Sequence, residues 1–264
     1  IIGGSAGTLL GLVALYQVRP SARVLAAALL CGEHLLQEAE IQPRGIGWPK
    51  KEIQEPALAG FSHGAAGVAA ALLALHQIQP DARYLAAAQN AFTYERSLFS
   101  EEAQNWPDLR QPTDEREKEI EVERFMLAWC HGAPGVGLGR LKVLDVLRDA
   151  AIEAEIATAV RTTQQIGFGH NHSLCHGDLG NLEFLLLASE KLMDSALQDH
   201  TYRVAAGILQ SIERNGWLCG VPNGVETPGL MTGITGIGYE LLRLAAPARV
   251  PSLLIMEPPR GRFS

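Results

Sequence analysis

Three Cys-His or Ser-His pairs, each followed directly by glycine, are the residues in this chain best suited to chemistry. Two thiolates and an imidazole form a ligand set that suits zinc, and a site with only three protein ligands keeps its fourth position for water or substrate. We therefore predict that Cys130, Cys175 and His176 hold one catalytic zinc ion. The three segments are Cys130-His131-Gly132, Cys175-His176-Gly177 and Ser62-His63-Gly64.

Each of these pairs stands at the start of a Gly-x-x-Gly repeat that precedes an apolar run. Two glycines around a two-residue step allow a tight entry into a helix and a close approach of backbones, so each repeat predicts a turn that opens a helix. The five repeats are Gly4 to Gly7, Gly64 to Gly67, Gly132 to Gly135, Gly177 to Gly180 and Gly233 to Gly236.

The segments after and between the repeats predict two layers of helices. The run Val68 to Leu75 is apolar all round, which is typical of an inner helix surrounded by protein. Amphipathic segments around Ile152 to Val160 and Ala205 to Ile212 predict an outer layer. The expected fold is an all-α toroid of helical hairpins, in which equivalent turns meet at one end of the ring.

This metal prediction depends on the register of the pairs with the repeat. A single buried cysteine is usually an apolar filler, and a single histidine is usually a hydrogen-bonded polar residue. Two Cys-His-Gly triplets in phase with a glycine repeat favour a shared metal ion instead.

Composition limits the other possibilities. The net charge of −7 leaves no broad basic face for nucleic acid, so we expect no nucleic-acid partner. Four cysteines are too few for a disulfide framework in 264 residues, which indicates a reducing, cytoplasmic location. The apolar start, Ile1 to Val18, lacks the basic flank of a signal peptide, and we expect neither a signal peptide nor a membrane span there.

Proline-rich and charged segments fall where the toroid requires loops. Breakers at 42–49, 105–108 and 251–259 predict connections between helices. The charged run Asp114 to Glu123 is expected to be a solvated loop or helix face. Five hairpins are fewer than a complete ring is expected to need, so we predict an incomplete toroid.

The motifs around these residues resemble those of the LanC-like lanthionine cyclases. They resemble the cyclase domain of bifunctional, class II (LanM-type) lanthipeptide synthetases more than the stand-alone cyclases. The matching segments are Trp129 to Gly135, Leu174 to Asn181, Pro228 to Gly233, and Asn105-Trp106-Pro107-Asp108.

The resemblance implies a reaction and roles for individual residues. Cys130, Cys175 and His176 fall on the family's zinc ligands, and His63 falls on its acid/base histidine. The expected reaction in lantibiotic biosynthesis is addition of a peptide cysteine thiolate to dehydroalanine or dehydrobutyrine, which forms a lanthionine or methyllanthionine thioether. His131 is a candidate to orient a zinc ligand through a hydrogen bond.

The resemblance also implies what accompanies the chain. Residues 1–264 are expected to form a single cyclase domain without its first hairpins, so that an aspartate the family uses has no counterpart here. The expected partners are a dehydrated precursor peptide and an upstream dehydratase domain in the full-length enzyme.

Four other residues are excluded from the predicted site. His170 and His172 are expected to be solvated or locally hydrogen-bonded, and Cys31 and Cys219 are expected to pack as apolar groups.

Two other functions remain open from the sequence. One is a non-catalytic module that binds zinc and thiol peptides. The other is an α/α-toroid glycoside hydrolase, for which Asp178 and Glu226 are the available carboxylates.

Overall fold

Every one of the five glycine repeats opens a helix of the inner layer, as predicted. The computed structural model describes residues 1–50, 55–110 and 124–259. The charged run Asp114 to Glu123 lies within 111–123, outside the described residues, as do 51–54 and 260–264. The first glycine of each repeat is the residue directly before the helix. The inner helices are α1 (Ser5–Val18), α3 (Ala65–Ile78), α6 (Ala133–Val143), α8 (Asp178–Leu192) and α10 (Ile234–Ala245).

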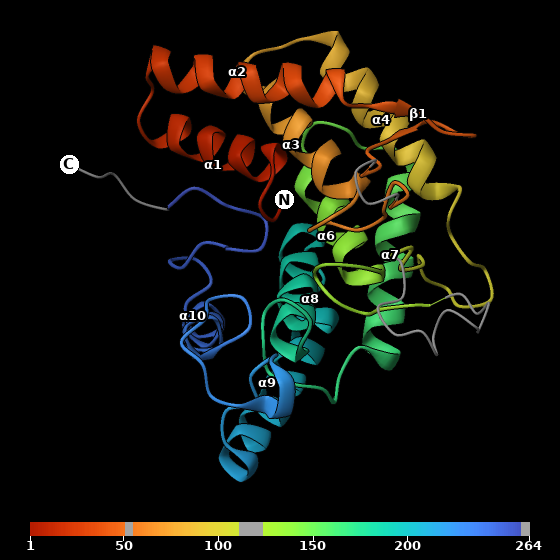
Figure 1. The fold of residues 1–264 in the computed structure, drawn as a ribbon. Coiled ribbons are helices and arrows are strands. Elements are labelled where there is room, and N and C mark those ends of the chain that lie inside the picture. Colours follow the sequence, from red (N-terminus) through yellow and green to blue (C-terminus); the bar gives the residue numbers. More distant parts are fainter. Residues whose placement is uncertain (51–54, 111–123, 260–264) are drawn as a thin grey trace.

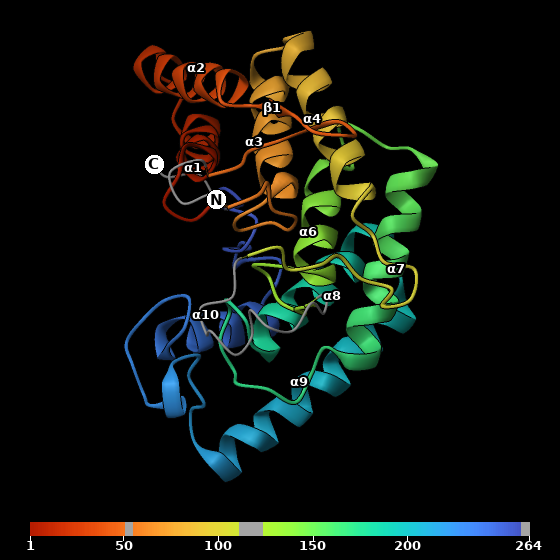
Figure 2. The same ribbon diagram turned by 45° about the vertical axis from the view of Figure 1, so that its right-hand side comes forward.

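Four of the inner helices pair with an outer helix that follows them in the chain. Contacts within the pairs α1 with α2, α3 with α4, α6 with α7 and α8 with α9 make four hairpins, and the inner helices pack side by side in chain order. The result is an α/α toroid, with the inner arc and the outer layer visible in Figures 1 and 2. The outer helices are α2 (Ala22–Gln37), α4 (Ala82–Arg96), α7 (Ala150–Ile166) and α9 (Ser195–Asn215).

A segment after α10 runs back between the two ends of this arc (Figure 1). The indole Nε1 of Trp129 donates a hydrogen bond of 3.0 Å to the backbone oxygen of Leu254. Met256 reaches α1, since a Cβ built on Gly11 would lie 3.9 Å from its methyl group. The segment is therefore anchored both to α1 and to the turn that carries Cys130.

A short antiparallel β pair interrupts the loop predicted over 42–49. The strands β1 (Glu40–Ile41) and β2 (Ile46–Gly47) pair through Glu40 with Gly47 and Ile41 with Ile46. Gly45 stands between them with φ of +74°, a conformation that favours glycine. Two-residue strands are too short to leave a periodic pattern in the sequence. A 3-10 turn, Pro222–Gly224, is the other short element.

The glycines of the repeat are required by a close backbone approach that recurs in every turn. In each repeat, a Cβ on the second glycine would collide with the carbonyl oxygen of the residue six positions earlier, so that no side chain fits there without displacing backbone. The distances from that Cβ to the oxygen are 2.0 Å at Gly7, 1.9 Å at Gly67, 2.5 Å at Gly135, 2.0 Å at Gly180 and 1.8 Å at Gly236.

The predicted division into buried inner and amphipathic outer helices is confirmed, with exceptions that include Leu15 of α1, which is 48% exposed. Residues 65–75 of α3 are all buried, and in α7 the predicted inward residues Ile152, Ile156 and Ala159 are buried. In α9, Leu209 was expected inside but is 45% exposed. Leu242 of α10 is also exposed, because α10 stands at the end of the arc with a neighbour on only one side.

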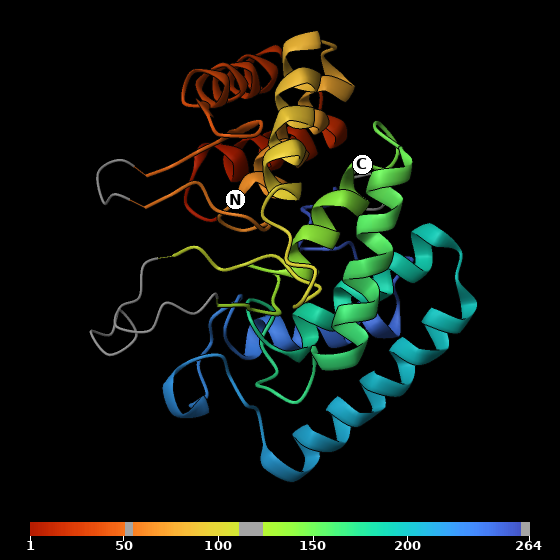
Figure 3. The ribbon, with the colours of Figure 1, turned by 90° about the vertical axis from the view of Figure 1, so that its right-hand side faces the viewer.

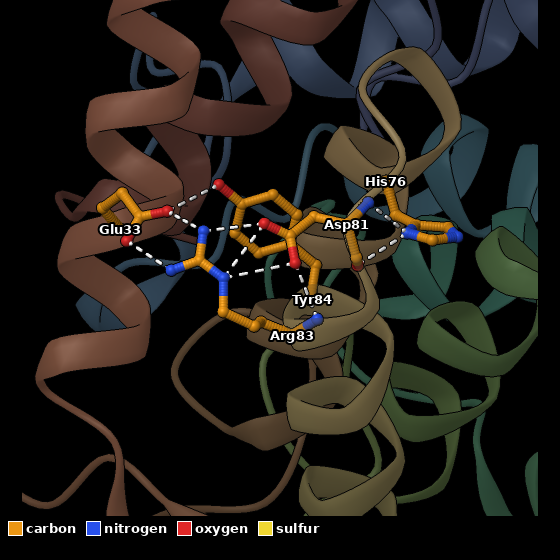
Figure 4. A network of polar contacts seen from close by, with 5 residues as sticks. All are labelled: Glu33, His76, Asp81, Arg83 and Tyr84. Carbon is orange, nitrogen blue, oxygen red and sulfur yellow. Dashed lines mark hydrogen bonds and ion pairs between the residues drawn. The ribbon is translucent and has the colours of Figure 1, made fainter.

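An ion-pair network connects the first two hairpins at the end of the ring opposite the turns (Figure 4). The guanidinium of Arg83 binds the carboxylates of Asp81 and Glu33, at 2.7 and 2.6 Å. The ring nitrogen Nδ1 of His76 contacts the backbone nitrogen and oxygen of Asp81, so the α3–α4 connection is fixed as well. Exposed pairs of this kind add about 1 kcal/mol or less to stability, so the network mainly orients α4 against α2.

None of the helices in the described part of the chain combines the length and apolarity needed to cross a bilayer.

Replacing Gly137 by alanine should destabilise the fold. Its Cβ would lie 2.4 Å from the ring of Phe184 and 3.0 Å from the Cβ of Ala159, and both residues are fully buried. We expect Gly137→Ala to lower the free energy of unfolding by about 1–3 kcal/mol, measured by urea denaturation. Gly207→Ala is the control: it lies in α9 with no atom within 4 Å of the new Cβ, and should raise stability by up to about 1 kcal/mol. Equal effects of the two changes would contradict the packing described for α6.

Candidate functional site

The turns before the inner helices meet at one end of the arc (Figure 3). The backbone nitrogen of Ile2 donates to the oxygen of Ser62 at 3.2 Å, and that of Cys175 donates to the oxygen of Met231 at 2.8 Å. Gly60, with φ of +101°, lies so close to Cys130 that a Cβ would be 2.7 Å from its carbonyl oxygen. These contacts between neighbouring turns place the residues that precede the glycines next to one another.

Cys130, Cys175 and His176 interact through their side chains. A hydrogen bond from the Cys130 thiol lowers the pKa of Cys175 to about 5 against the opposing effect of burial, and His176 lowers it further. The same contacts raise the pKa of Cys130 and, through Cys175, that of His176. Cys175 therefore interacts both with Cys130, from a turn 45 residues earlier, and with its chain neighbour His176.

The loop that precedes α10 packs its backbone against His176. A Cβ on Gly220 would lie 2.9 Å from Nε2 of His176 and 2.5 Å from the Oγ of Ser173. The backbone nitrogen of Gly220 donates to the oxygen of Thr232 at 2.7 Å, which ties this loop to the last glycine turn. Gly220 thus allows the loop to approach the imidazole and limits how the ring can turn.

The side chains are not already arranged around a single point. Among residues 1–50, 55–110 and 124–259, no group of three or more His, Cys, Asp or Glu side chains stands in an arrangement that could hold a metal ion. All four cysteines are free thiols.

His63 lies beside this group and stacks on His131. The two ring centroids are 5.2 Å apart and the ring planes differ by 12°. Burial, together with the nearby charge of Lys50, lowers the pKa of His63, which favours the neutral imidazole at neutral pH. His131 is 1% exposed, and burial lowers its pKa to about 4. Neither ring nitrogen of His131 has a hydrogen-bond partner among the described residues.

Asp108 and Arg110 also belong to the site, although the sequence analysis assigned no role to either. Oδ1 of Asp108 lies 3.9 Å from Nδ1 of His131. The guanidinium of Arg110 holds this carboxylate through Nη2 at 2.6 Å and Nε at 2.9 Å. Its positive charge also acts on both cysteine thiols and favours their ionised form. Asp108 is the last residue of the Asn-Trp-Pro-Asp motif, and its place in that motif was the sequence feature that could have identified it as a site residue.

Two asparagines fix the turn that carries Cys130. Asn105 is 1% exposed; its Oδ1 accepts hydrogen bonds from the backbone nitrogens of Trp106 and Ala133, and its Nδ2 donates to the oxygen of Met126. Nδ2 of Asn181 donates to the oxygens of Leu127 and Gly167, at 2.9 and 2.7 Å. The buried amides thus connect three loops at the end of the ring.

Glu95 holds both ends of the turn that carries His63. Its Oε1 accepts from the backbone nitrogens of Gly60 at 2.8 Å and Ala66 at 3.2 Å. Its Oε2 accepts from Nη1 of Arg140 at 2.7 Å, and both side chains are fully buried. Since Arg140 lies on α6, which follows the Cys130 turn, this ion pair fixes the His63 turn relative to the turn of Cys130.

The four residues that the sequence analysis left out of the predicted site differ in burial and in hydrogen bonding. His172 is buried rather than solvated, and is hydrogen-bonded to the backbone nitrogen of Leu218 and to Oγ of Ser211. His170 is exposed at the loop surface, Cys219 is buried, and Cys31 is partly buried on α2.

The two carboxylates considered for a glycosidase do not form a pair suited to hydrolysis. The carboxylate of Asp178 accepts hydrogen bonds from the backbone nitrogens of Gly169 and His170, so it closes the loop before α8. Glu226 is exposed in the loop before α10.

The sequence is similar to a family model and to a curated protein. The model, described as lanthionine synthetase C-like protein, matches residues 1–255. The lacticin 481/lactococcin biosynthesis protein LcnDR2 of Lactococcus lactis subsp. lactis is 27% identical over 202 residues. These residues are 70% of this chain and 20% of that protein, so the chain spans about one fifth of the relative's length.

Solved structures share the fold at low identity. Nisin cyclase superposes with a TM-score of 0.65 at 20% identity, over 94% of this chain and 65% of its own. A sugar epimerase from a ruminal bacterium has a TM-score of 0.63 at 12% identity, over 89% of this chain and 67% of its own. A GH76 alpha-mannanase from Bacteroides thetaiotaomicron has a TM-score of 0.62 at 13% identity, over 93% of this chain and 69% of its own. At these identities the likeness establishes the toroid fold and leaves the reaction undetermined.

Replacing Glu95 should loosen the His63 turn. Glu95→Ala leaves the buried guanidinium of Arg140 without one of its carboxylate partners, and we expect the free energy of unfolding to fall by about 3–5 kcal/mol. Glu95→Gln keeps an acceptor oxygen and should lose less. In both variants the amide hydrogens of Gly60 and Ala66 should exchange faster, as followed by hydrogen exchange.

The control for Glu95 is Glu153→Ala on α7, where the side chain is 53% exposed. We expect a change within about 0.5 kcal/mol there. If the exchange at Gly60 and Ala66 is unchanged in Glu95→Ala, the carboxylate does not hold the turn.

Proposed function

The chain belongs to the lanthionine synthetase C-like family, and from this premise we propose that it forms thioether rings in lanthipeptides, the products of lantibiotic biosynthesis. The observation that carries the proposal is the interaction of Cys175 with both Cys130 and His176, while His131, the neighbour of Cys130 in the chain, stacks on His63. A thiol-rich group next to a neutral histidine is suited to sulfur chemistry with a proton transfer.

The donor set of the three residues fits a zinc ion. Two sulfurs and one imidazole are soft and borderline ligands that zinc accepts in tetrahedral sites. The lowered pKa of Cys175 favours the thiolate that a metal requires, and the charge of Arg110 favours it in both cysteines. We propose that Cys130, Cys175 and His176 hold zinc after loss of the thiol proton and adjustment of their side chains. When bound, zinc supplies the positive charge that keeps a substrate cysteine ionised.

His63 supplies the proton transfer of the proposed reaction. The sulfur of the peptide cysteine forms a bond to the β-carbon of dehydroalanine or dehydrobutyrine, and the electrons of the C=C bond move to form an enolate. The neutral imidazole of His63 takes the thiol proton and returns it to the α-carbon, so that no group leaves and no redox partner is needed. Burial keeps this imidazole neutral before the reaction.

His131 and Asp108 position His63 in this scheme. The ring of His131 covers one face of His63, and Oδ1 of Asp108 lies 3.9 Å from Nδ1 of His131. We propose that His131 limits the rotation of His63 and also supports the neighbouring ligand Cys130, since ligand geometry commonly depends on such contacts.

The proposed dehydroamino acid acceptor indicates which partners the chain requires. A dehydroamino acid must first be made by dehydration of serine or threonine, so we propose a dehydrated precursor peptide as substrate and a dehydratase domain, upstream in a longer protein, as partner. Thiols in this number are kept reduced in the cytoplasm, which we propose as the location.

The second candidate function is a module that binds zinc and thiol peptides without joining them. It would use the same three ligands and leave His63 without a role. The glycosidase alternative has less support, since Asp178 already accepts two backbone hydrogen bonds.

Zinc content tests the ligand set. We expect about one zinc per purified chain by elemental mass spectrometry, and loss of that zinc in Cys130→Ala, Cys175→Ala and His176→Ala. Cys31→Ala removes a thiol on α2 and should keep the metal. Absence of zinc from well-folded wild-type chain, or its retention in Cys175→Ala, would contradict the site.

Ring formation tests His63. With a peptide that contains one cysteine and one dehydroalanine, His63→Ala should slow loss of the free thiol about 10²- to 10⁴-fold, because general acid/base catalysis contributes that much. Zinc content should not change. His76→Ala on α3 is the matched control, with its ring at the other end of the helix. A wild-type rate in His63→Ala would refute its role, and zinc binding without any ring formation in the wild type would favour the binding module.

A further inference from the structure

Two neighbouring recesses lie near the site, and His176 lines the first of them. The first has a volume of about 460 Å³ and is lined by His176, by His170 and Asn171, and by residues 218–224. The second, of about 400 Å³, lies between the loop 168–170 and the face of α9. His170 and Leu218 line both, so the two recesses adjoin one another, and we call them together the exit groove.

The wall shared by the two recesses is fixed by hydrogen bonds. The backbone nitrogen of His172 donates to the oxygen of Leu218 at 2.7 Å, and the nitrogen of Leu218 donates to Nδ1 of His172 at 3.1 Å. Nε2 of His172 lies 3.0 Å from Oγ of Ser211 on α9. These bonds connect the loop before α8, the loop after α9 and α9 itself, so the groove is preformed.

The lining of the exit groove combines polar and apolar side chains in the first recess and exposes mainly apolar surface in the second. Asp178, the carboxylate in the second recess, already accepts hydrogen bonds from backbone nitrogens at 169 and 170. Such a surface suits a ligand that has both polar backbone groups and apolar side chains. The apolar residues are Leu218, Val221 and Pro222 in the first recess and Phe168, Val204, Ile208 and Leu218 in the second.

We propose that the exit groove binds the part of the substrate peptide adjoining the reacting cysteine, in extended form. This inference rests on the proposed function. A cysteine held at the group of Cys130, Cys175 and His176 is flanked by peptide on both sides, and the exit groove begins at His176 itself. Dehydration removes the hydroxyl groups of serine and threonine, which leaves the apolar side chains that this lining accepts.

The dimensions favour a peptide over a small molecule. Each recess alone falls within the range of small-ligand sites, roughly 300–1,000 Å³, and the two adjoin at His170 and Leu218. A ligand that occupies both must extend from His176 past these two residues to α9.

Gly207 offers a way to block the groove without disturbing the fold. It lines the second recess on α9, it is exposed, and a Cβ there meets no atom within 4 Å. Gly207→Trp therefore fills the far part of the groove and leaves His176 and His63 untouched. Gly238→Trp on α10 is the matched control, since its Cβ also meets no atom within 4 Å and Gly238 is outside both recesses.

The experiment compares two dehydrated peptides, each with one cysteine and one dehydroalanine. The short one ends at these two residues, and the long one continues on both sides with neutral apolar residues. Gly207→Trp should weaken binding of the long peptide, followed by fluorescence anisotropy, by about ten- to hundredfold, the effect of excluding one apolar side chain from burial. Binding of the short peptide, zinc content and the short peptide's rate of ring formation should match wild type, and Gly238→Trp should match wild type throughout.

The outcomes separate this proposal from the proposed function. Equal binding of the long peptide to wild type and Gly207→Trp overturns the exit groove even if rings form normally. Weaker binding in Gly207→Trp supports the groove even if the wild type forms no ring, in which case only the catalytic proposal fails. Equal weakening by Gly238→Trp would also overturn it, because the effect would then not belong to this surface.

Discussion

The rest of the structure depends on one close contact, between a backbone oxygen of each turn and the second glycine of its repeat. In all five turns a backbone oxygen lies where the Cβ of the residue six positions later would be, so that residue must be glycine. Because the same geometry recurs, residues one or two positions before the first glycine reach the same level at the end of the ring. His63, Cys130, Cys175 and His176 all occupy such positions. The repeat that builds the toroid thus also assembles the chemical group.

Buried ion pairs then fix how one hairpin sits against the next. Arg140 on α6 joins Glu95 on α4, and its Nε donates to Glu155 on α7 at 2.5 Å. On the other side, Arg243 of α10 joins Glu183 of α8 at 2.7 Å. Burial of such pairs costs much of what their attraction gains, so their net contribution to stability is small. Their value here is directional, since apolar helices alone can slide past one another while a buried carboxylate accepts only from donors placed around it.

The sequence predicted the parts of this molecule that repeat and could not predict the parts that occur once. The spacing of the glycine repeats predicted the inner helices, the hairpins and the proximity of the turns that carry the cysteines, because each of these follows from a local pattern. Glu95, Asp108 and Gly220 were not identified, since each acts through a partner distant in sequence: Glu95 on Gly60, Asp108 on His131, and Gly220 on His176. A buried glutamate on an outer helix looks like any polar residue of a solvated face. The prediction that Leu209 is buried was wrong for a different reason. Its position fits the helical period, but α9 is exposed at that point.

The toroid by itself does not select a reaction. Its likeness to a cyclase, a sugar epimerase and an alpha-mannanase at TM-scores between 0.62 and 0.65 shows that one arrangement of helices accompanies very different proteins. What differs is the set of side chains that the turns present. Hydrolysis of a glycoside needs two carboxylates across a cleft, whereas here the turns present thiols and imidazoles, and the nearby Asp108 is held by Arg110. A thiolate binds soft metal ions and has no proton to give to a sugar oxygen. The choice among reactions on this scaffold is therefore made by a few residues next to the glycines.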